Sequence, residues 1–170
     1  MRAILLEAGW LGEGSIGSVS HDSQRMPLDA WLEEAAALLG PHAADRAALT
    51  ELLRMIFHYH PRAVMENPEN QSVLMRSGAR EVIRELANRV LAGSEIDSDR
   101  FKEIIEGIKT ALPYRSRALF HPIRVALAGR AGEGELDRAI LLLDSAAKIN
   151  FAVKVKGARQ RMLEFCAALD

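Results

Sequence analysis

The sequence predicts an all-α protein made of two small helical subdomains, residues 1–66 and residues 67–170. Alanine and leucine dominate the composition, and the alternation of apolar and polar residues that is typical of strands is scarce. Apolar residues instead recur at helical spacing in several segments, each bounded by glycine, proline or a capping residue. The polar, turn-prone segment 66–71 marks the boundary between the two subdomains.

Helices in the first half of the chain are predicted from amphipathic runs between helix breakers. Pro27 opens the first helix, and Gly40 and Pro41 close it. The second helix stops at Pro61, and the third, a single long helix, ends at Gly93. Their expected ranges are 27–39, about 43–59 and about 72–91.

Helices in the second half follow from the same signals. Asp97 or Ser98 caps a helix that ends before Pro113, and a short helix then begins at Pro122 and ends at Gly129. Further helices are expected at 135–144 and 157–169. Two segments stay open: residues 2–6 are a strand or the start of a helix, and residues 150–156 are a strand edge or a helix.

Length and composition describe a chain that can fold without cross-links. Its 170 residues, 49% of them hydrophobic, are enough to bury a core. The single cysteine, Cys166, excludes an internal disulfide framework, and its apolar helix stripe predicts a buried, inert thiol. No apolar run approaches the ~18 residues of a membrane span, and the N-terminal apolar run, residues 3–6, is too short for a signal peptide. We therefore expect a cytoplasmic protein that does not enter membranes.

The distribution of charge points to an anionic partner. The whole chain has a net charge of -1, but residues 1–96 carry 9 basic and 13 acidic side chains, whereas residues 97–170 carry 13 and 10. Two segments, 107–132 and 145–163, contain no acidic residue. Positive charge without neighbouring carboxylates suits a polyanion such as a nucleic acid, although an ordinary solvated helix face can show the same pattern.

Motifs for catalysis or cofactor binding are weak. Residues 12–17, Gly-Glu-Gly-Ser-Ile-Gly, have the spacing of a dinucleotide-binding loop, but no strand–helix alternation surrounds them, so an ordinary loop is the default. The Ser-His-Asp run at 20–22 is consecutive and cannot converge on one reacting atom. His58 and His60 do not share a helical face for a metal. We predict no catalytic residue, no metal site and no cofactor, and no enzyme activity from this chain alone.

Residues 120–129, Phe-His-Pro-Ile-Arg-Val-Ala-Leu-Ala-Gly, resemble a segment of the C-terminal anticodon-binding domain of bacterial-type glutamyl-tRNA synthetases. In that family the segment reads Phe-x-Pro-(Leu or Ile)-Arg-x-Ala-Leu-(Thr or Ser)-Gly and precedes a short loop and a leucine-rich helix. Ala128 replaces the small hydroxyl residue, and the clear similarity covers residues 79–144. The resemblance implies an all-α cage of two helical subdomains that grips the anticodon loop of tRNA.

The resemblance also implies roles for two residues. Arg124 would contact anticodon bases, and Leu136, which opens the next helix, would lie against the anticodon. A planar guanidinium suits base edges and phosphates, although a salt bridge to a neighbouring helix is the alternative for Arg124. From the charge pattern we expect further basic residues to neutralise phosphates or extend the binding track: Arg115, Arg117, Arg130, Lys154, Lys156, Arg159 and Arg161.

The expected partner is tRNA, with a tRNA for glutamate as the first candidate, and not DNA. The signature elements of a synthetase catalytic half do not occur in this sequence, so aminoacylation would need a separate synthetase catalytic body. One alternative is a protein-interaction module that kept the fold and lost RNA binding, with aromatic anchors near Trp10 and Trp31, although Trp31 is more typical of a core. Another is an enzyme of unrecognised type, which needs a strongly perturbed titratable group in a pocket.

Overall fold

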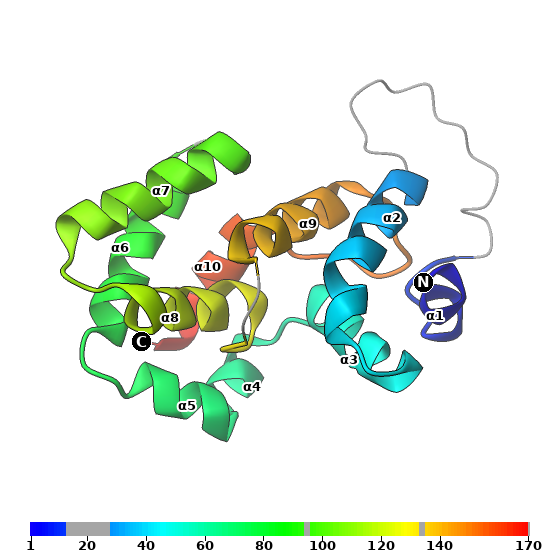
Figure 1. The fold of residues 1–170 in the computed structure, drawn as a ribbon, viewed down its shortest axis with the longest axis horizontal. Coiled ribbons are helices and arrows are strands. Elements are labelled where there is room, and N and C mark those ends of the chain that lie inside the picture. Colours follow the sequence, from blue (N-terminus) through cyan, green and yellow to red (C-terminus); the bar gives the residue numbers. More distant parts are fainter. Residues whose placement is uncertain (13–27, 94–95, 133–134, 170) are drawn as a thin grey trace. The chain divides into compact units, whose positions relative to one another are not determined.

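The computed structural model describes residues 1–12, 28–93, 96–132 and 135–169 (Figure 1). Over these residues the chain forms helices, turns and irregular segments and no strand, so the all-α prediction is confirmed. Each helix in this part is too short or too polar to cross a lipid bilayer. The chain divides into two compact units, which we call unit 1 (Met1–His58 with Leu142–Gly157) and unit 2 (Tyr59–Leu141 with Ala158–Asp170). The subdomain boundary that the sequence favours, at residues 66 and 67, stays a prediction.

Unit 1 is built around a cluster of aromatic rings. Its elements are α1 (Arg2–Glu7), α2 (Leu28–Leu39), the 3-10 helix η2 (Gly40–His42), α3 (Arg46–Phe57), the end of α9 (Leu136–Lys148) and the irregular segment 149–157. Trp10 stacks on Phe57 with ring centroids 4.7 Å apart, and Phe151 meets Phe57 edge-on at 5.0 Å. Trp10 and Trp31 are 3% and 0% exposed, so the idea that either is an exposed anchor for a partner is wrong.

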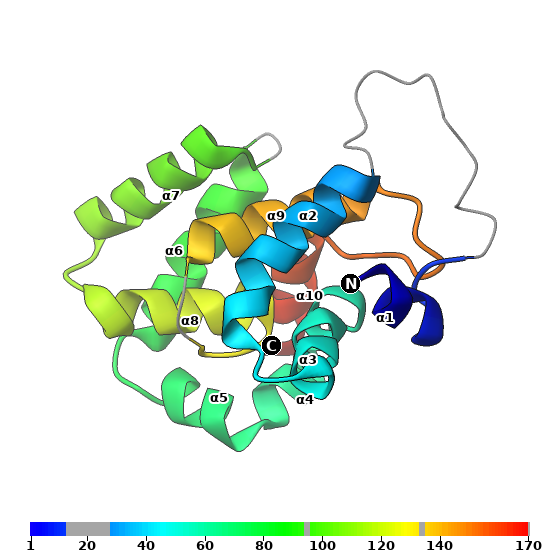
Figure 2. The same ribbon diagram turned by 45° about the vertical axis from the view of Figure 1, so that its right-hand side comes forward.

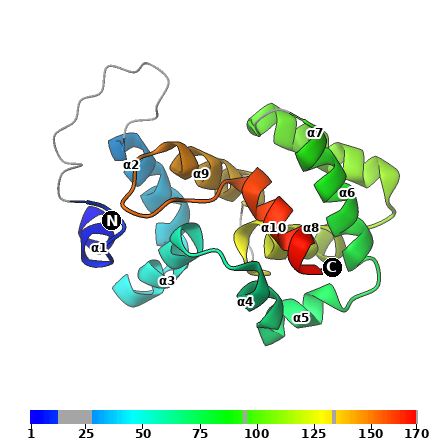
Figure 3. The same cartoon turned by 180° about the vertical axis from the view of Figure 1, so that it is seen from behind.

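Unit 2 surrounds α8 (Ser116–Ala128), most of whose apolar side chains are buried. The helices that contact α8 are α4 (Pro61–Glu66), α5 (Pro68–Leu74), α6 (Ala79–Ala92) and α10 (Ala158–Leu169). Seen from behind, α10 lies beside α8 and α6 (Figure 3). α7 (Ser98–Ala111) packs on α6 (Figure 2), and the first part of α9 completes the unit.

Pro122 lies inside α8 and does not begin it, which corrects the prediction of a short helix opened by this proline. A proline in a helix interior removes one backbone hydrogen bond and costs about 3 kcal/mol. Pro122 is itself buried, together with Leu119, Ile123 and Ala126. Burial of this apolar face against the surrounding helices offsets the local cost. The predicted end of the helix is confirmed, because Gly129 caps α8 with φ 81°.

Two helices, α5 and α6, replace the single long helix predicted at 72–91. A turn separates them, and Gly78 in this turn has φ 85°. The positive φ favours glycine, and a Cβ atom at this position would lie 2.1 Å from the Tyr114 ring, which would have to shift. Gly93 ends α6, as predicted.

The structure also decides the three remaining segments whose conformation the sequence left open or predicted as a turn. Residues 2–6 lie in α1, and residues 150–156 are neither strand nor helix. The turn expected at 66–71 is confined to Asn67, whose side chain accepts hydrogen bonds from two backbone N–H groups of α5 and caps that helix. Residues 68–71 are helical because Asn67 and the proline after it form a helix start, and Glu66 is the last residue of α4.

Asp97 caps α7, as predicted, because its Oδ1 accepts a hydrogen bond from the backbone N–H of Arg100 at 2.8 Å. We expect Asp97→Ala to lower the free energy of unfolding by about 1 kcal/mol, since one helix N–H loses its partner. Asp97→Asn keeps an accepting oxygen and should remain within about 0.5 kcal/mol of the parent protein. Urea denaturation followed by circular dichroism measures both variants. Equal losses in the two would contradict the capping role.

Candidate nucleic-acid interface

Arg124 lies in a groove of about 360 Å³ on unit 2, lined by α7, α8 and the start of α9. We call this the Arg124 groove. Its lining residues are Phe101, Lys102, Ile105, Glu106 and Lys109 from α7, Phe120 and Arg124 from α8, and Leu136 and Asp137 from α9. The two residues that the family resemblance singles out, Arg124 and Leu136, therefore share one groove.

Helical spacing explains which side chains reach the Arg124 groove. Phe120 and Arg124 are one turn apart on α8, and the lining residues of α7 also recur at steps of three and four. Phe101, Ile105 and Leu136 are buried and make the groove apolar at its base. The α7 residues were not predicted from the sequence, because only the tertiary structure brings α7 beside the motif.

The Arg124 groove carries charges of both signs. Lys102, Lys109 and Arg124 lie in it together with Glu106 and Asp137. Lys109 pairs with Glu106 at 2.6 Å across one helical turn, and such a surface pair contributes little stability. Arg124 is half-buried. Its neighbours in the groove therefore include two carboxylates as well as two lysines.

Three side chains hold the C-terminal end of α8, where helix carbonyls lack backbone partners. Tyr59 Oη and Arg161 Nη1 donate to two successive carbonyls in the last turn of α8, at 2.5 and 3.0 Å. Asn70 Nδ2 donates to the carbonyl of Gly129 at 2.9 Å. Burial raises the pKa of the Tyr59 phenol, and the Arg161 charge opposes this only in part, so the phenol remains a donor at neutral pH. These contacts position the motif segment where it leaves α8.

Arg161 is fully buried, which corrects the expectation that it extends an RNA-binding track. Its Cζ lies 4.5 Å from the centroid of the Tyr59 ring, within the range of a cation–π contact. A guanidinium enclosed in this way does not reach a phosphate. Helical spacing in the sequence could have indicated this, because Arg161 follows Ala158 by three residues and precedes Phe165 by four, and both are buried.

Arg115 and Arg159 both act as caps for the C-terminal ends of helices. Arg115 donates to three backbone carbonyls at 2.7–2.8 Å, two of them at the end of α7. Arg159 donates to the carbonyls of Val90 and Gly93 at the end of α6, at 3.2 and 3.0 Å. Both residues are exposed, but part of their donor capacity is used within the fold.

The other predicted cations are at or near the surface. Arg117 and Arg130 are exposed on unit 2, and Arg117 lies two turns before Arg124 on the same face of α8. Lys154 is exposed and Lys156 is half-buried, both in the irregular segment of unit 1. Contacts of these four residues with RNA stay predictions.

The other candidate chemistry gains no support from the described residues. Within them, no group of three or more His, Cys, Asp or Glu side chains could hold a metal ion. His58 accepts a hydrogen bond from Trp10 Nε1 at 2.9 Å, and His60 is the N-cap of α4. Cys166 is only partly buried, which corrects the prediction of a buried thiol. The motifs at 12–17 and 20–22 fall, from residue 13 onward, outside the described residues.

An all-α chain with a groove that combines cations with aromatic and leucine side chains has the features of a helical nucleic-acid-binding domain. Residues 11–146 match the family model described as the anticodon binding domain. The chain therefore belongs to the anticodon-binding-domain family, and the resemblance inferred from its motif is confirmed.

The similar proteins found among curated sequences are ligases. The chain is 31% identical over 153 residues to the glutamate–tRNA ligases of Bacillus thuringiensis (strain Al Hakam) and Bacillus anthracis, which covers 90% of this chain and 29% of each ligase. It is 30% identical over 141 residues to the glutamate–tRNA ligase of Bacillus cytotoxicus, covering 83% of this chain and 28% of that ligase. The chain thus spans less than a third of the length of these relatives. No solved structure matches it.

Proposed function

We propose that this chain is a tRNA-binding module that holds an anticodon loop in the Arg124 groove. The observation that carries the proposal is the family match, which spans residues 11–146 and so includes α8 and most of α9. The relatives are glutamate–tRNA ligases, so a tRNA for glutamate is the proposed ligand. We place this binding in the cytoplasm.

The chemistry of the groove supports a single-stranded RNA loop. Proteins read RNA mainly through unpaired bases that stack on aromatic rings or guanidinium planes. Phe120 and Arg124 offer one of each, one turn apart on α8. Arg117 and Arg130 would then contact phosphates, with Lys154 and Lys156 as further cations of the track. Arg115 and Arg159 would add charge, with fewer free donors.

The chain would bind tRNA without charging it. The part of the ligases that it matches is 29% of their length, and the matching family is named for binding. We propose that these residues contribute recognition, and that a synthetase catalytic body performs the reaction.

We expect Arg124→Ala to weaken tRNA binding by about 1–3 kcal/mol, because the planar guanidinium and its charge are both lost. Arg124→Lys keeps the charge but not the planar guanidinium, so its tRNA affinity should lie between those of the parent protein and Arg124→Ala. Filter binding of a glutamate tRNA transcript at fixed salt measures the three proteins. Arg54→Ala on α3, an exposed arginine paired with Glu51 at 3.3 Å, is the matched control and should bind as the parent does.

The salt dependence separates phosphate contacts from base contacts. Each phosphate contact contributes a slope of roughly -0.7 to -0.9 in log affinity against log salt. A double-stranded DNA of similar length should bind more weakly than the tRNA at every salt concentration.

Unchanged tRNA affinity in Arg124→Ala would remove this residue from the interface. A folded chain with no affinity for any tRNA would instead favour the protein-interaction module as its function.

A further inference from the structure

A second groove lies on unit 2, with a volume of about 750 Å³, and shares no lining residue with the Arg124 groove. It is formed by α4, α5, the turn between α5 and α6, the first turns of α6, and the end of α10. We call it the Met75 groove. Its apolar lining comes from all of these elements: Met65, Leu74, Met75, Ile83 and Leu169.

Two apolar side chains of the Met75 groove are unusually open to solvent. Met75 is 85% exposed and Leu169 is 40% exposed. Three large hydrophobic side chains are exposed in the described part of the chain, and two of them line this one groove. Clustered apolar exposure marks interaction surfaces, and methionine adapts to the shape of a partner.

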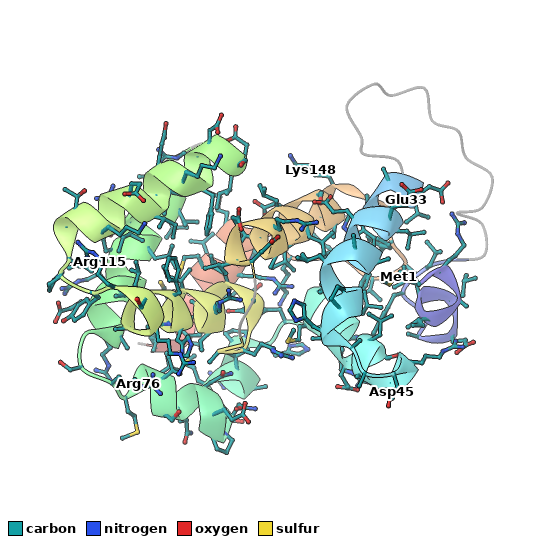
Figure 4. The ribbon with its side chains drawn as sticks, in the orientation of Figure 1. Met1, Glu33, Asp45, Arg76, Arg115 and Lys148 are labelled. Atoms are coloured by element: carbon teal, nitrogen blue, oxygen red, sulfur yellow. The ribbon has the colours of Figure 1, made fainter. Side chains whose placement is uncertain are left out.

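Three arginines, which we call the arginine row, lie at the Met75 groove or one helical turn from it: Arg76 in the turn before α6, and Arg80 and Arg84 on α6. Arg76 and Arg80 line it, and Arg84 is one turn further along α6 (Arg76 is labelled in Figure 4). All three are exposed, and none of their side chains forms an ion pair with another described residue. Glu81, the carboxylate in the lining, accepts a hydrogen bond from Tyr114 Oη at 3.2 Å. The edge therefore carries positive charge that this part of the chain does not neutralise.

The first turn of α6 adds to this preference for negative charge. Its N-cap is Gly78, which lines the groove and has no side chain to accept hydrogen bonds from the helix N–H groups. The Ala79 N–H donates to the Arg76 carbonyl at 3.1 Å, and Glu81 lies in the first turn of α6, so the helix dipole is what adds to the positive charge of the arginines here. The groove thus combines an apolar surface with an anion-attracting edge.

We infer that the Met75 groove binds an acidic amphipathic helix of a partner protein. Apolar residues on one face of such a helix, at i, i+3, i+4 and i+7, would cover Met75 and Leu169. Carboxylates beside that face would meet the arginine row, of which Arg80 and Arg84 are one helical turn apart on α6. A nucleic acid would satisfy the arginines but would leave the exposed apolar side chains uncovered. A protein helix therefore fits both parts of the surface.

The experiment uses the full chain and synthetic helical peptides of about five turns, roughly 18 residues each. One set carries leucines at i, i+3, i+4 and i+7 with flanking glutamates, and the matched set carries lysine in place of each glutamate. Fluorescence anisotropy measures affinity, and methyl-labelled methionine NMR locates the site. We expect only acidic peptides to bind, and the methyl signals of Met65 and Met75 to shift while that of the fully buried Met162 does not.

Charge-reversal variants test the arginine row. Arg80→Glu combined with Arg84→Glu should weaken acidic-peptide binding by about tenfold or more and leave glutamate tRNA binding unchanged. Arg54→Glu on α3 of unit 1 is the matched control and should change neither. Circular dichroism shows whether each variant is folded.

Several results would overturn the inference. One is that no acidic peptide binds with a Kd below about 1 mM. Another is that the lysine peptides bind as tightly as the acidic ones. Loss of tRNA binding in the double charge-reversal variant, without peptide binding, would make this a nucleic-acid surface. Self-association in sedimentation that Met75→Ser abolishes would make it an interface between copies of this chain.

Discussion

Trp31→Ala should lower the free energy of unfolding by about 3–5 kcal/mol, because it removes one of the two buried tryptophan side chains of the unit 1 core. Trp31 is 0% exposed and meets Phe151 edge-on, with ring centroids 5.1 Å apart. Its Nε1–H also donates to the carbonyl of Leu142 at 3.1 Å. The alanine variant therefore creates a cavity and removes one of the hydrogen bonds to that carbonyl, which also accepts from Ser145 Oγ at 3.1 Å.

Urea denaturation of the Trp31 variants, followed by circular dichroism, measures this loss. Trp31→Phe keeps an aromatic ring and loses the hydrogen bond, so we expect a smaller loss of about 1–2 kcal/mol. A loss below about 1 kcal/mol in Trp31→Ala would show that this side chain is not a core residue in solution. In that case an exposed tryptophan anchor for a partner protein would again be a valid hypothesis.

Arg161→Ala is expected to destabilise the protein by a similar amount, about 3–5 kcal/mol. Arg161 lies in a basic run of the sequence, which by itself indicates an exposed residue. The variant removes a fully buried guanidinium that stacks on Tyr59 and donates to a carbonyl of α8. The end of α8 would lose one of the contacts that position the motif segment. Thermal unfolding should show a midpoint lowered by roughly 6–20 °C for a chain of this size.

Comparison with Arg124→Ala separates a structural arginine from a binding arginine. At temperatures below its unfolding transition, Arg161→Ala should bind tRNA more tightly than Arg124→Ala does. The midpoint of thermal unfolding of Arg124→Ala should be close to that of the parent protein. Arg159→Ala, two residues away and exposed, is the control for position in the sequence and should cost about 1 kcal/mol of stability. Parent-like stability of Arg161→Ala together with weak tRNA binding would restore Arg161 to the RNA track.

The Arg124 groove could be predicted only in part. Arg124 and Leu136 came from the resemblance of a ten-residue motif, and the structure places them in one groove. Phe101 and Lys102 could not be placed there from the sequence, because α7 is separated from the motif by a turn whose direction depends on packing. The charge pattern was less informative, since a run of basic residues does not show which of them are exposed.

The sequence by itself determined the helical class and most helix ends. Capping residues such as Asp97 and stop signals such as Gly93 and Gly129 act within a few residues, through hydrogen bonds and φ angles that neighbours set. Only the tertiary structure decided that Pro122 lies within a helix, that a turn at Gly78 divides α5 from α6, and that Arg161 is buried. Each of these depends on contacts between segments far apart in the chain, because burial of apolar surface outweighs local preference.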